Sequence, residues 1–506
     1  MTDSLEVLPF DQFNQELVNN VHPPDWVNPE PDGRYNLVAI GAGTAGLVTA
    51  LGAAGLGAKV AMIERHLMGG DCLNFGCVPS KGLIRAGRAA ASVRCASDFG
   101  IGASNEAVDF AAVMERMRKL RAQISHNDSA ERCRRDGVDM FIGEATFEDS
   151  NTIRVGDKRL KFKNAVICTG ARAKAPAIPG LEEAGYLTNE TVFSLAELPK
   201  RMAVIGAGPI GSELAQAFAR FGCQVTVLEM QSHILAREDA DACEVVQESM
   251  VRDGIDLRFQ ATVAKITSGD DGKCVHFEQN GKEQSVTTDE ILVAIGRAPN
   301  IDGLNLDRVG VETNQFGVVV DDFLRTTNPK IYAAGDICSR FKFTHAADYQ
   351  ARIVIRNTLF WFLPKARASR LVIPWCTYTD PELAHVGLTE ATAAKAGIAV
   401  QTLTQPLADV DRAILDGEDE GFVRVHLKEG TDKIVGATIV ASHAGDMISE
   451  ICLAMTNNLG IKSIGGTIHP YPTQADAIRK LGDAFNRTRM SPKVRRLFER
   501  VFSFGR

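Results

Sequence analysis

The 506-residue sequence lacks the features that mark membrane, secreted and nucleic-acid-binding proteins. Its most apolar stretch near the middle, residues 353–364, contains Arg356 and is shorter than the roughly 20 apolar residues that a membrane-spanning helix needs. The first ten residues have neither a basic region nor an apolar leader. Lys and Arg number 56 against 63 Asp and Glu, and the net charge of −7 offers no general attraction for nucleic acid. We therefore expect no membrane span, no secretion leader and no nucleic-acid partner.

The composition excludes further classes. Hydrophobic residues at 45% and charged residues at 24% are typical of a globular protein, which excludes disorder, a collagen-like repeat and a coiled-coil rod. The length is about three times that of a typical domain, so the chain predicts two to four hydrophobic cores. The 11 cysteines are odd in number and spread over a long chain, which favours a reducing, cytoplasmic location.

The chain divides into an arm and an alternating region. Residues 1–34 are polar and rich in proline, show no sustained period, and are expected to form a leading arm. From there to about residue 300, β-branched runs alternate with Ala-rich segments, which is typical of parallel βαβ units. The expected fold class is α/β.

A pair of glycine motifs forms an internal repeat. Each motif follows a strand-like run, opens a helix-like segment, and is followed by an acid at the end of the next strand. The offset from first glycine to acid is the same in both copies, 64 − 41 = 23 and 229 − 206 = 23. The motif residues are Gly41, Gly43 and Gly46 with Glu64, and Gly206, Gly208 and Gly211 with Glu229.

The repeat predicts two dinucleotide sites. One such motif alone could be a tight turn, but two copies with the same offset argue against that reading. The first glycine permits the turn, the second lets the backbone approach a pyrophosphate, and the third lets the helix pack on the strand. The acid accepts hydrogen bonds from a ribose diol, and Glu229 would repel the 2′-phosphate of NADP. The second site therefore favours NADH over NADPH.

A cysteine pair follows the first unit in the segment GGDCLNFGCVPSK. Cys72 and Cys77 are spaced to meet across one turn, and no second Cys or His pair lies nearby to complete a zinc site, so we expect redox chemistry and no metal. Pro79 suits the first turn of a helix, which would place Cys77 near a positive helix end that favours its thiolate. Cys77 is the candidate thiolate, and Cys72 is the candidate sulfur that exchanges with substrate.

With these residues in place, the chain resembles the pyridine nucleotide-disulfide oxidoreductases, the family of glutathione reductase, lipoamide dehydrogenase and mercuric reductase. The resemblance implies two Rossmann-like domains, for FAD and NAD(P), and a C-terminal α+β dimerisation domain that makes a homodimer. The expected divisions are an extension at 1–34, an FAD-binding domain at 35–180 and 303–368, an NAD(P)-binding domain at 181–302, a dimerisation domain at 369–485, and a basic amphipathic tail at 486–506.

The resemblance also assigns site residues. The first glycine motif and Glu64 would hold the ADP part of FAD, Cys77 and Lys81 would approach the isoalloxazine, and Glu213 would pair with that lysine. The second motif and Glu229 would hold the nicotinamide nucleotide. The remaining assigned positions are Ala145, Thr169, Gly170, Gly335 and Asp336 at the FAD and Gly296 at the nicotinamide nucleotide.

The C-terminal part departs from the pattern of the disulfide reductases. They carry His-Pro-Thr with a glutamate three residues beyond, and that histidine is an acid/base delivered from the partner subunit. Here Tyr471 stands at the histidine position and Asp476 at the glutamate position, and mercuric reductases also have tyrosine there. A tyrosine with an ordinary pKa near 10 is a poor proton shuttle at neutral pH. His469 could serve instead, or it could simply pack near the interface.

The acceptor of the electrons stays open. Mercuric reductases pass Hg(II) inward through a C-terminal cysteine pair, whereas the last cysteine here is Cys452 and no metal-binding CxxC precedes residue 35. What the resemblance retains is hydride transfer from nicotinamide to flavin and electron transfer to the Cys72–Cys77 disulfide. Hg(II), a small disulfide or dithiol, and a quinone-like acceptor remain candidate substrates.

A different reading is a redox-sensing or membrane-surface interaction flavoprotein with little turnover. It depends on the tail, where apolar residues fall at helical spacing opposite cations. The alternative for the tail is a terminal helix packed on its own domain or on the dimer mate. The apolar positions are Val494, Leu497, Phe498, Val501 and Phe502, and the cations are Lys493, Arg495, Arg496 and Arg500.

Overall fold

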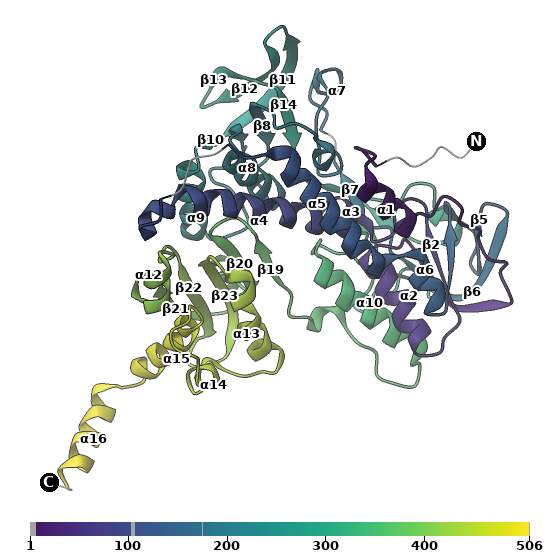
Figure 1. Cartoon of the computed structure of the whole chain (residues 1–506). Coiled ribbons are helices and arrows are strands. Elements are labelled where there is room, and N and C mark those ends of the chain that lie inside the picture. The colour runs from purple at the N-terminus through teal and green to yellow at the C-terminus, as the bar shows by residue number, and fades with distance from the viewer. Residues whose placement is uncertain (1–6, 103–106, 175, 505–506) are drawn as a thin grey trace. The chain divides into compact units, whose positions relative to one another are not determined.

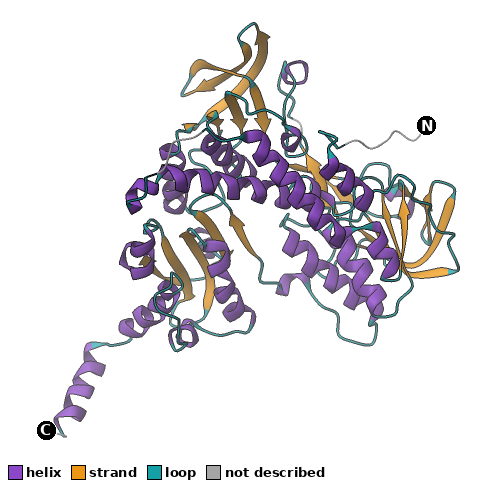
Figure 2. Ribbon diagram, viewed as in Figure 1, coloured by secondary structure: helices purple, strands orange, loops and turns teal. Residues whose placement is uncertain are grey.

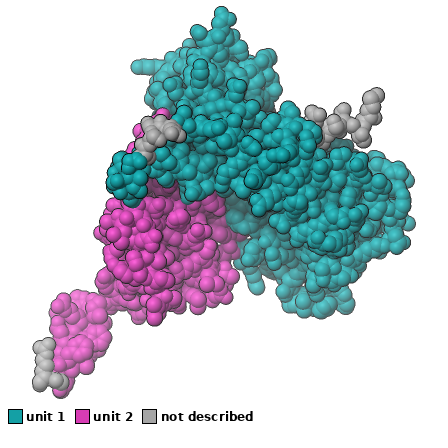
Figure 3. Space-filling model, viewed as in Figure 1, with its two compact units in different colours: residues 1–230, 256–371 teal, residues 231–255, 372–506 magenta. Residues whose placement is uncertain are grey.

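A computed structural model describes residues 7–102, 107–174 and 176–504. The chain forms two compact units, shown in different colours in Figure 3. Unit 1 contains Met1–Met230 and Asp256–Leu371, and unit 2 contains Gln231–Ile255 and Val372–Arg506. Helices and sheets occur in both units (Figure 2), and the α/β fold class is confirmed.

Unit 1 is built on a sheet in the order β3-β2-β1-β6-β5-β4, with β18 also paired to β6. The strands β1, β2, β3, β6 and β18 run parallel, and β4 and β5 add an antiparallel edge. The last four residues of the central strand β1 are all buried, as expected for a parallel strand covered on both faces. The bounds are β1 Arg34–Ile40, β2 Val60–Glu64, β3 Val138–Ile142, β4 Ala145–Asp149, β5 Thr152–Val155, β6 Lys158–Ile167 and β18 Ile331–Ala333.

Two pairs of helices pack together in this part of unit 1, α2 with α10 and α4 with α5 (Figure 1), and α2 lies against β1 and β2. The sequence of α2 is rich in glycine and alanine, and a Cβ on Gly52 would lie 2.8 Å from Ile355 Cδ1 of α10. Small residues therefore let these two helices approach closely. The bounds are α2 Thr44–Gly55, α3 Gly70–Asn74, α4 Cys77–Arg94, α5 Phe110–Ser125, α6 Ala130–Arg135, α7 Leu181–Ala184 and α10 Thr344–Leu359.

A second parallel sheet in unit 1, in the order β10-β9-β8-β14, repeats the strand-turn-helix arrangement of the first. Helix α8 follows β8 and packs against α4, and a three-stranded antiparallel sheet follows later in the chain. The bounds are β8 Arg201–Ile205, α8 Pro209–Phe221, β9 Gln224–Leu228, β10 Asp256–Arg258, β11 Ala261–Gly269, β12 Gly272–Gln279, β13 Lys282–Thr288 and β14 Glu290–Val293, with the short pairs β7 Ala171–Ala173 with β15 Arg297–Pro299 and β16 Thr313–Asn314 with β17 Gly317–Val318.

Unit 2 is an antiparallel sheet with helices, in the strand order β19-β20-β23-β22-β21. A cluster of buried aliphatic residues from β22, β23, α13 and α15 forms its core. The bounds are α9 Ala240–Arg252, β19 Pro374–Thr377, β20 Glu382–Gly387, α11 Glu390–Lys395, β21 Val400–Pro406, α12 Asp411–Asp416, β22 Phe422–Lys428, β23 Ile434–Ala441, α13 Ala444–Thr456, α14 Ile461–Gly465, α15 Asp476–Thr488 and α16 Pro492–Ser503.

The expectation that the N-terminal arm has no regular period is wrong for part of it. Residues Gln12–Val21 form α1, and the Asp11 carboxylate accepts hydrogen bonds from the amides of Phe13 and Asn14 in its first turn. Leu17 and Val21 are fully buried in the core of unit 1. A ten-residue helix is too short to be stable alone, so this one depends on tertiary packing, which the local sequence pattern does not reveal.

The C-terminal helix α16 has no buried residue, and its apolar side chains are exposed within the chain. The exposure of Leu497, Phe498, Val501 and Phe502 favours the dimer mate or another surface over its own unit as the partner of the tail. Among the described residues, no helix has both the length and the hydropathy needed to cross a bilayer.

Candidate active site

The first glycine turn joins β1 to α2. Gly41 has φ +101°, and its amide donates to the carbonyl of Ile63 at 2.7 Å. A Cβ on Gly46 would lie 1.7 Å from the carbonyl oxygen of Gly41, so only glycine allows the helix to start this close to the turn. The Glu64 carboxylate ends β2 and accepts a 2.7 Å hydrogen bond from the amide of Ala42. Burial raises the pKa of Glu64, and its backbone hydrogen bonds oppose that shift.

The second glycine turn, between β8 and α8, has the same geometry. Gly206 also has φ +101°, and a Cβ on Gly211 would lie 2.0 Å from the carbonyl oxygen of Gly206. The Glu229 carboxylate accepts a 2.7 Å hydrogen bond from the amide of Ala207, in the position that Glu64 takes in the first turn. The sequence repeat is therefore also a repeat of structure.

Both turns fit the phosphates of a dinucleotide. A Cβ on Gly208 would meet nothing within 4 Å, and one on Gly43 would meet only Gly70 Cα, at 3.7 Å. These glycines are the N-caps of α8 and α2, and neither helix has a side-chain cap. The backbone amides of both helix starts are thus open to an anion, which is the interaction a pyrophosphate makes with such a turn.

The two cysteines lie on either side of a helix boundary. Cys72 is in α3 and half-buried, whereas Cys77 is the first residue of α4 and exposed, so the expected helix does begin at Cys77. Both are free thiols, and Cys77 Sγ lies 3.5 Å from Thr344 Oγ1.

The surroundings give the two thiols different pKa values. A hydrogen bond from Cys72 lowers the pKa of Cys77 to about 6, with further lowering from the Thr344 hydroxyl and the charge of Lys81. The hydrogen bond to Cys77 and burial raise the pKa of Cys72. The pair therefore holds its negative charge on Cys77 and its proton on Cys72.

An ion pair stands beside the cysteines. Lys81, one turn along α4 from Cys77, donates to Glu213 Oε2 of α8 at 2.9 Å. The Glu213 side chain is only 7% exposed. The structure thus brings together two residues that are 132 positions apart and that the sequence assigned to one site.

Asp336 and Gly335 lie at the end of β18, against the first glycine turn. A Cβ on Gly335 would lie 3.2 Å from Ala45 Cβ of α2. Arg297 pairs with Asp336 at 3.5 Å and with Asp71 at 3.1 Å. Burial raises the pKa of Asp336, and the charge of Arg297 opposes this.

The other assigned positions lie at strand ends. Ala145 begins β4 and is buried, and Gly296 precedes β15 with φ +133°. The Thr169 hydroxyl donates to the carbonyl of Asn300 at 2.7 Å, and Gly170 has φ +66°. No contact of these residues identifies a ligand, so their cofactor roles stay predictions.

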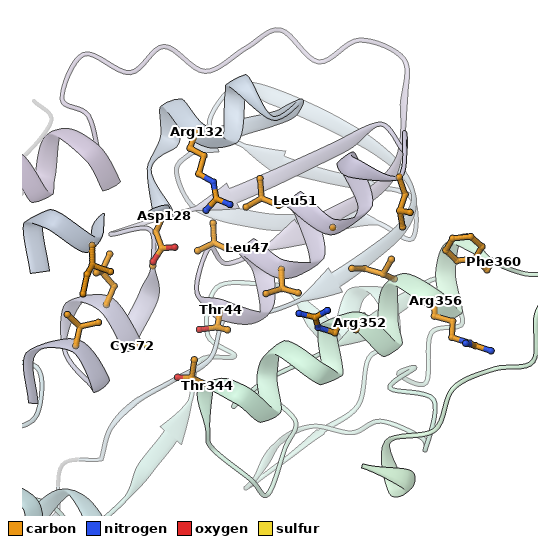
Figure 4. A pocket seen from close by; sticks show the side chains of 18 of the residues that line it. Thr44, Leu47, Leu51, Cys72, Asp128, Arg132, Thr344, Arg352, Arg356 and Phe360 are labelled. Atoms are coloured by element: carbon orange, nitrogen blue, oxygen red, sulfur yellow. The ribbon is translucent and has the colours of Figure 1, made fainter. Parts of the chain in front are cut away.

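A cavity of about 920 Å³ opens beside Cys72. In Figure 4, Cys72 and Thr344 lie at one end of it, and Phe360 and Arg356 lie toward the other. Most of its wall is apolar, and Asp128 provides a carboxylate next to Cys72. The residues from α2, α10 and the following loop are Thr44, Leu47, Val48, Leu51, Gly52, Leu56, Thr344, Arg352, Ile355, Arg356, Phe360 and Leu363.

Tyr471 is exposed in unit 2, with 73% of its surface accessible. Its hydroxyl donates to Asp411 Oδ2 at 2.7 Å, and this hydrogen bond to a carboxylate raises the pKa of the phenol. Asp476 instead accepts from Arg479 Nε at 2.6 Å. The structure therefore pairs Tyr471 with Asp411, and not with the acid that the resemblance placed beside it.

His469 is engaged within unit 2. Its side chain is 6% exposed, Nε2 lies 2.9 Å from Glu450 Oε1, and Nδ1 lies 3.0 Å from the carbonyl of Thr467. Both ring nitrogens have partners, so His469 is less free than Tyr471 to act on a substrate.

Three residues that contact the assigned ones carry no motif in the sequence. Thr344 touches Cys77 from the start of α10, Arg297 links Asp71 to Asp336, and Asp411 holds the Tyr471 hydroxyl. A polar residue at a helix start is a weak signal for Thr344. The other two partnerships span long stretches of chain and leave no local pattern.

Two family models match the chain. One, described as pyridine nucleotide-disulphide oxidoreductase, matches residues 35–351, and the other, the dimerisation domain of the same description, matches residues 373–481. A mercuric reductase of Staphylococcus aureus is 36% identical over 457 residues, which are 90% of this chain and 83% of that protein. A dihydrolipoyl dehydrogenase of Bacillus subtilis is 36% identical over 443 residues, 86% of this chain and 93% of that protein.

Two solved structures illustrate the similarity of fold. The HOCl-induced flavoprotein disulfide reductase RclA of Escherichia coli has a TM-score of 0.78 at 27% identity, covering 89% of this chain and 99% of that one. LpdA of Mycobacterium tuberculosis has a TM-score of 0.80 at 26% identity, with the same coverage of both chains.

Proposed function

The chain belongs to the pyridine nucleotide-disulphide oxidoreductases, and from that membership we propose that it passes electrons from NADH through FAD to the pair Cys72 and Cys77, and from there to an acceptor. Bound FAD would accept the hydride of the nicotinamide and reduce the disulfide. The observation that carries the proposal is the asymmetry of the cysteine pair, with Cys72 at the cavity and Cys77 at the helix start beside Lys81.

The two sulfurs take different roles in this proposal. In the reduced pair, Cys77 Sγ holds the negative charge at neutral pH because its pKa is lowered to about 6, and Cys72 Sγ holds the proton. Cys72 is also the sulfur that lines the cavity. Cys72 therefore faces the acceptor, and Cys77 is the charged partner at the start of α4.

Lys81 and Glu213 would hold the flavin side of the site. The ion pair orients the Lys81 ammonium across α4 and α8, and the nearly buried Glu213 carboxylate compensates its charge. An oriented cation beside the cysteines stabilises the Cys77 thiolate and any negative charge that develops on a bound ring.

The second glycine turn supports a preference for NADH. The Glu229 carboxylate lies at the end of β9, where a ribose diol donates hydrogen bonds and a 2′-phosphate meets repulsion. The first turn, with Glu64, would hold the ADP part of FAD.

The match to the dimerisation domain supports a homodimer, and we propose that each active site is shared between two chains. In this arrangement the partner's exposed tyrosine at position 471 reaches the cysteine pair. The Asp411 carboxylate keeps the phenol protonated, so Tyr471 would act as a hydrogen-bond donor to the substrate.

Three acceptor classes remain within the proposal: Hg(II)-thiol complexes, small disulfides, and quinones. An anaerobic titration of the FAD-loaded protein with NADH, followed by each acceptor, would identify which class reoxidises the flavin. With the true acceptor, the rate of flavin reoxidation should be at least 100-fold lower in Cys72→Ser than in wild type. If the acceptor reoxidises Cys72→Ser as fast as wild type, electrons leave the flavin directly and the proposed path is wrong.

A further inference from the structure

The loop that follows α10 exposes a cluster of large apolar side chains. Trp361 is 77% exposed, Phe362 is 64% exposed and Leu363 is 39% exposed. The Phe362 ring packs edge-on against Trp361, with centroids 5.9 Å apart, and against Phe360 at 6.0 Å. The aromatic rings therefore pack on one another, while a large part of their surface faces outward. We call residues 360–363 the aromatic loop.

The segment that carries the aromatic loop is basic, although the chain is acidic overall. No Asp or Glu occurs between Asp348 and Asp380, and this stretch holds five cations. Arg352 and Arg367 have carboxylate partners, Asp348 and Asp322. The other three cations, which are exposed and form no ion pair with any described carboxylate, are Arg356, Lys365 and Arg370.

The aromatic loop is continuous with the cavity at the redox pair. Phe360 and Leu363 line the same cavity as Cys72 (Figure 4). The aliphatic part of this wall comes mainly from α2, for example Leu47 and Leu51, and α10 adds Ile355 together with Arg352 and Arg356. An apolar molecule that reaches the loop can therefore follow an apolar wall to the sulfur.

We propose that the aromatic loop docks on an anionic bilayer surface, and that a lipid-soluble quinone reaches Cys72 from that bilayer through the cavity. Tryptophan and phenylalanine beside unpaired cations match the apolar and anionic parts of a membrane interface. Contact of this loop with the same loop of a second copy would instead bring the unpaired cations close to like charges. The inference rests on the proposed function, since it names the acceptor of the same cysteine pair.

The redox step balances without a further reactant. The reduced pair gives two electrons to the quinone, and a sulfur–sulfur bond forms between Cys72 and Cys77. The quinone oxygens take two protons, one from the Cys72 thiol and one from water, because Cys77 is already a thiolate. NADH supplies the electrons for the next cycle.

Vesicle flotation tests the docking surface directly. Full-length, FAD-loaded protein is floated with phosphatidylcholine vesicles and with vesicles that also contain phosphatidylglycerol. The wild type should float with the anionic vesicles, and the double variant Trp361→Ser/Phe362→Ser should bind them at least fivefold more weakly than the wild type. Lys365→Gln/Arg370→Gln should weaken it by about fivefold for each charge removed. Phe316→Ser is the matched control, because Phe316 is 71% exposed in the turn between β16 and β17 and should leave binding unchanged.

A second measurement tests the route to the cysteine. Oxidation of NADH is followed with a water-soluble short-chain quinone and with a long-chain quinone held in anionic vesicles. The Trp361→Ser/Phe362→Ser variant should keep the rate with the soluble quinone and lose at least fivefold with the vesicle-bound one. Equal rates of wild type and variant with the vesicle-bound quinone would contradict the route.

Failure of this inference and failure of the proposed function give different results. Wild type that does not float, or a Trp361→Ser/Phe362→Ser variant that floats as well as wild type, overturns the docking surface even if NADH oxidation proceeds. Loss of self-association in that variant, seen by analytical ultracentrifugation, would identify the loop as an interface between copies and would also overturn it. Absence of turnover with every acceptor would overturn the proposed function, while flotation still decides the docking.

Discussion

Replacing Lys81 with methionine should raise the pKa of Cys77. The hydrogen bond from Cys72 is the largest cause of the lowered pKa, followed by the Thr344 hydroxyl, and the positive charge of Lys81 adds to both. Methionine keeps the apolar stem of the side chain and removes the charge together with the hydrogen bond to Glu213. Since a nearby cation stabilises a thiolate, its removal shifts the equilibrium toward the thiol.

The size of the shift follows from helix geometry and Coulomb's law. Residues four apart on a helix have side chains about 6 Å apart, where a unit charge at an effective dielectric of about 20 contributes roughly 3 kcal/mol, or about 2 pKa units. Glu213, 2.9 Å from the Lys81 ammonium, cancels part of this field. We therefore expect the pKa of Cys77 to rise by about 1 unit, from about 6 toward about 7.

The assay is the pH dependence of alkylation. Reduced protein is treated with iodoacetamide between pH 5 and 9, a range of about two units around the expected transition, and the two cysteines are quantified separately by mass spectrometry. In the wild type, Cys77 should react with a midpoint near pH 6, and Cys72 should stay slow across that range. The midpoint, unlike the absolute rate, does not depend on how accessible the sulfur is.

Arg85→Met is the control for this experiment, since Arg85 lies one turn further along α4 and is exposed. Removing the Arg85 charge should shift the alkylation midpoint of Cys77 by much less than removing the Lys81 charge. If Lys81→Met leaves the midpoint of Cys77 unchanged, or if Cys72 has the lower midpoint in the wild type, the electrostatic assignment of the two sulfurs is refuted.

Three other predictions test the remaining parts of the site. Two-electron reduction per subunit should produce a long-wavelength charge-transfer band from the Cys77 thiolate to oxidised flavin. The band should disappear in Cys77→Ser and persist in Cys72→Ser. If both variants behave alike, the roles assigned to the two sulfurs are wrong. NADH should give a higher kcat/KM than NADPH because Glu229 repels a 2′-phosphate, and faster stopped-flow reduction by NADPH would contradict this. A mixed dimer of a Cys72→Ser/Cys77→Ser chain with a Tyr471→Ala/Asp476→Ala chain should recover about half of wild-type activity, since one of its two sites is whole. Activity at the level of the mutants, in a stable mixed dimer, would show that position 471 acts within its own chain.

The sequence was most informative where function depends on local backbone geometry. The two glycine turns need small residues at set spacings, and the structure shows the same φ, the same close approach and the same acid-to-amide hydrogen bond in both. The helix start at Cys77 followed from Pro79 for the same reason. Such features are encoded within a few residues and can be read directly.

Long-range partners were harder to predict. The acid beside Tyr471 is Asp411, 60 residues away in the chain, whereas the neighbouring Asp476 is held by Arg479. The helix of the N-terminal arm was missed because its stability comes from packing and not from propensity. The exposure of the aromatic loop was likewise invisible, since an apolar run in a sequence does not reveal whether it is covered. Lys81 and Glu213 were paired correctly only through the family resemblance.

The central claim is that electrons from NADH reach Cys72 and Cys77. The most direct test is to count thiols in the FAD-loaded, oxidised protein before and after anaerobic reduction by one equivalent of NADH per subunit, with alkylation and peptide mapping. We expect two new alkylated thiols, at Cys72 and Cys77, and no change at the other nine cysteines. A reduced flavin with both cysteines still linked, or new thiols elsewhere in the chain, would contradict it.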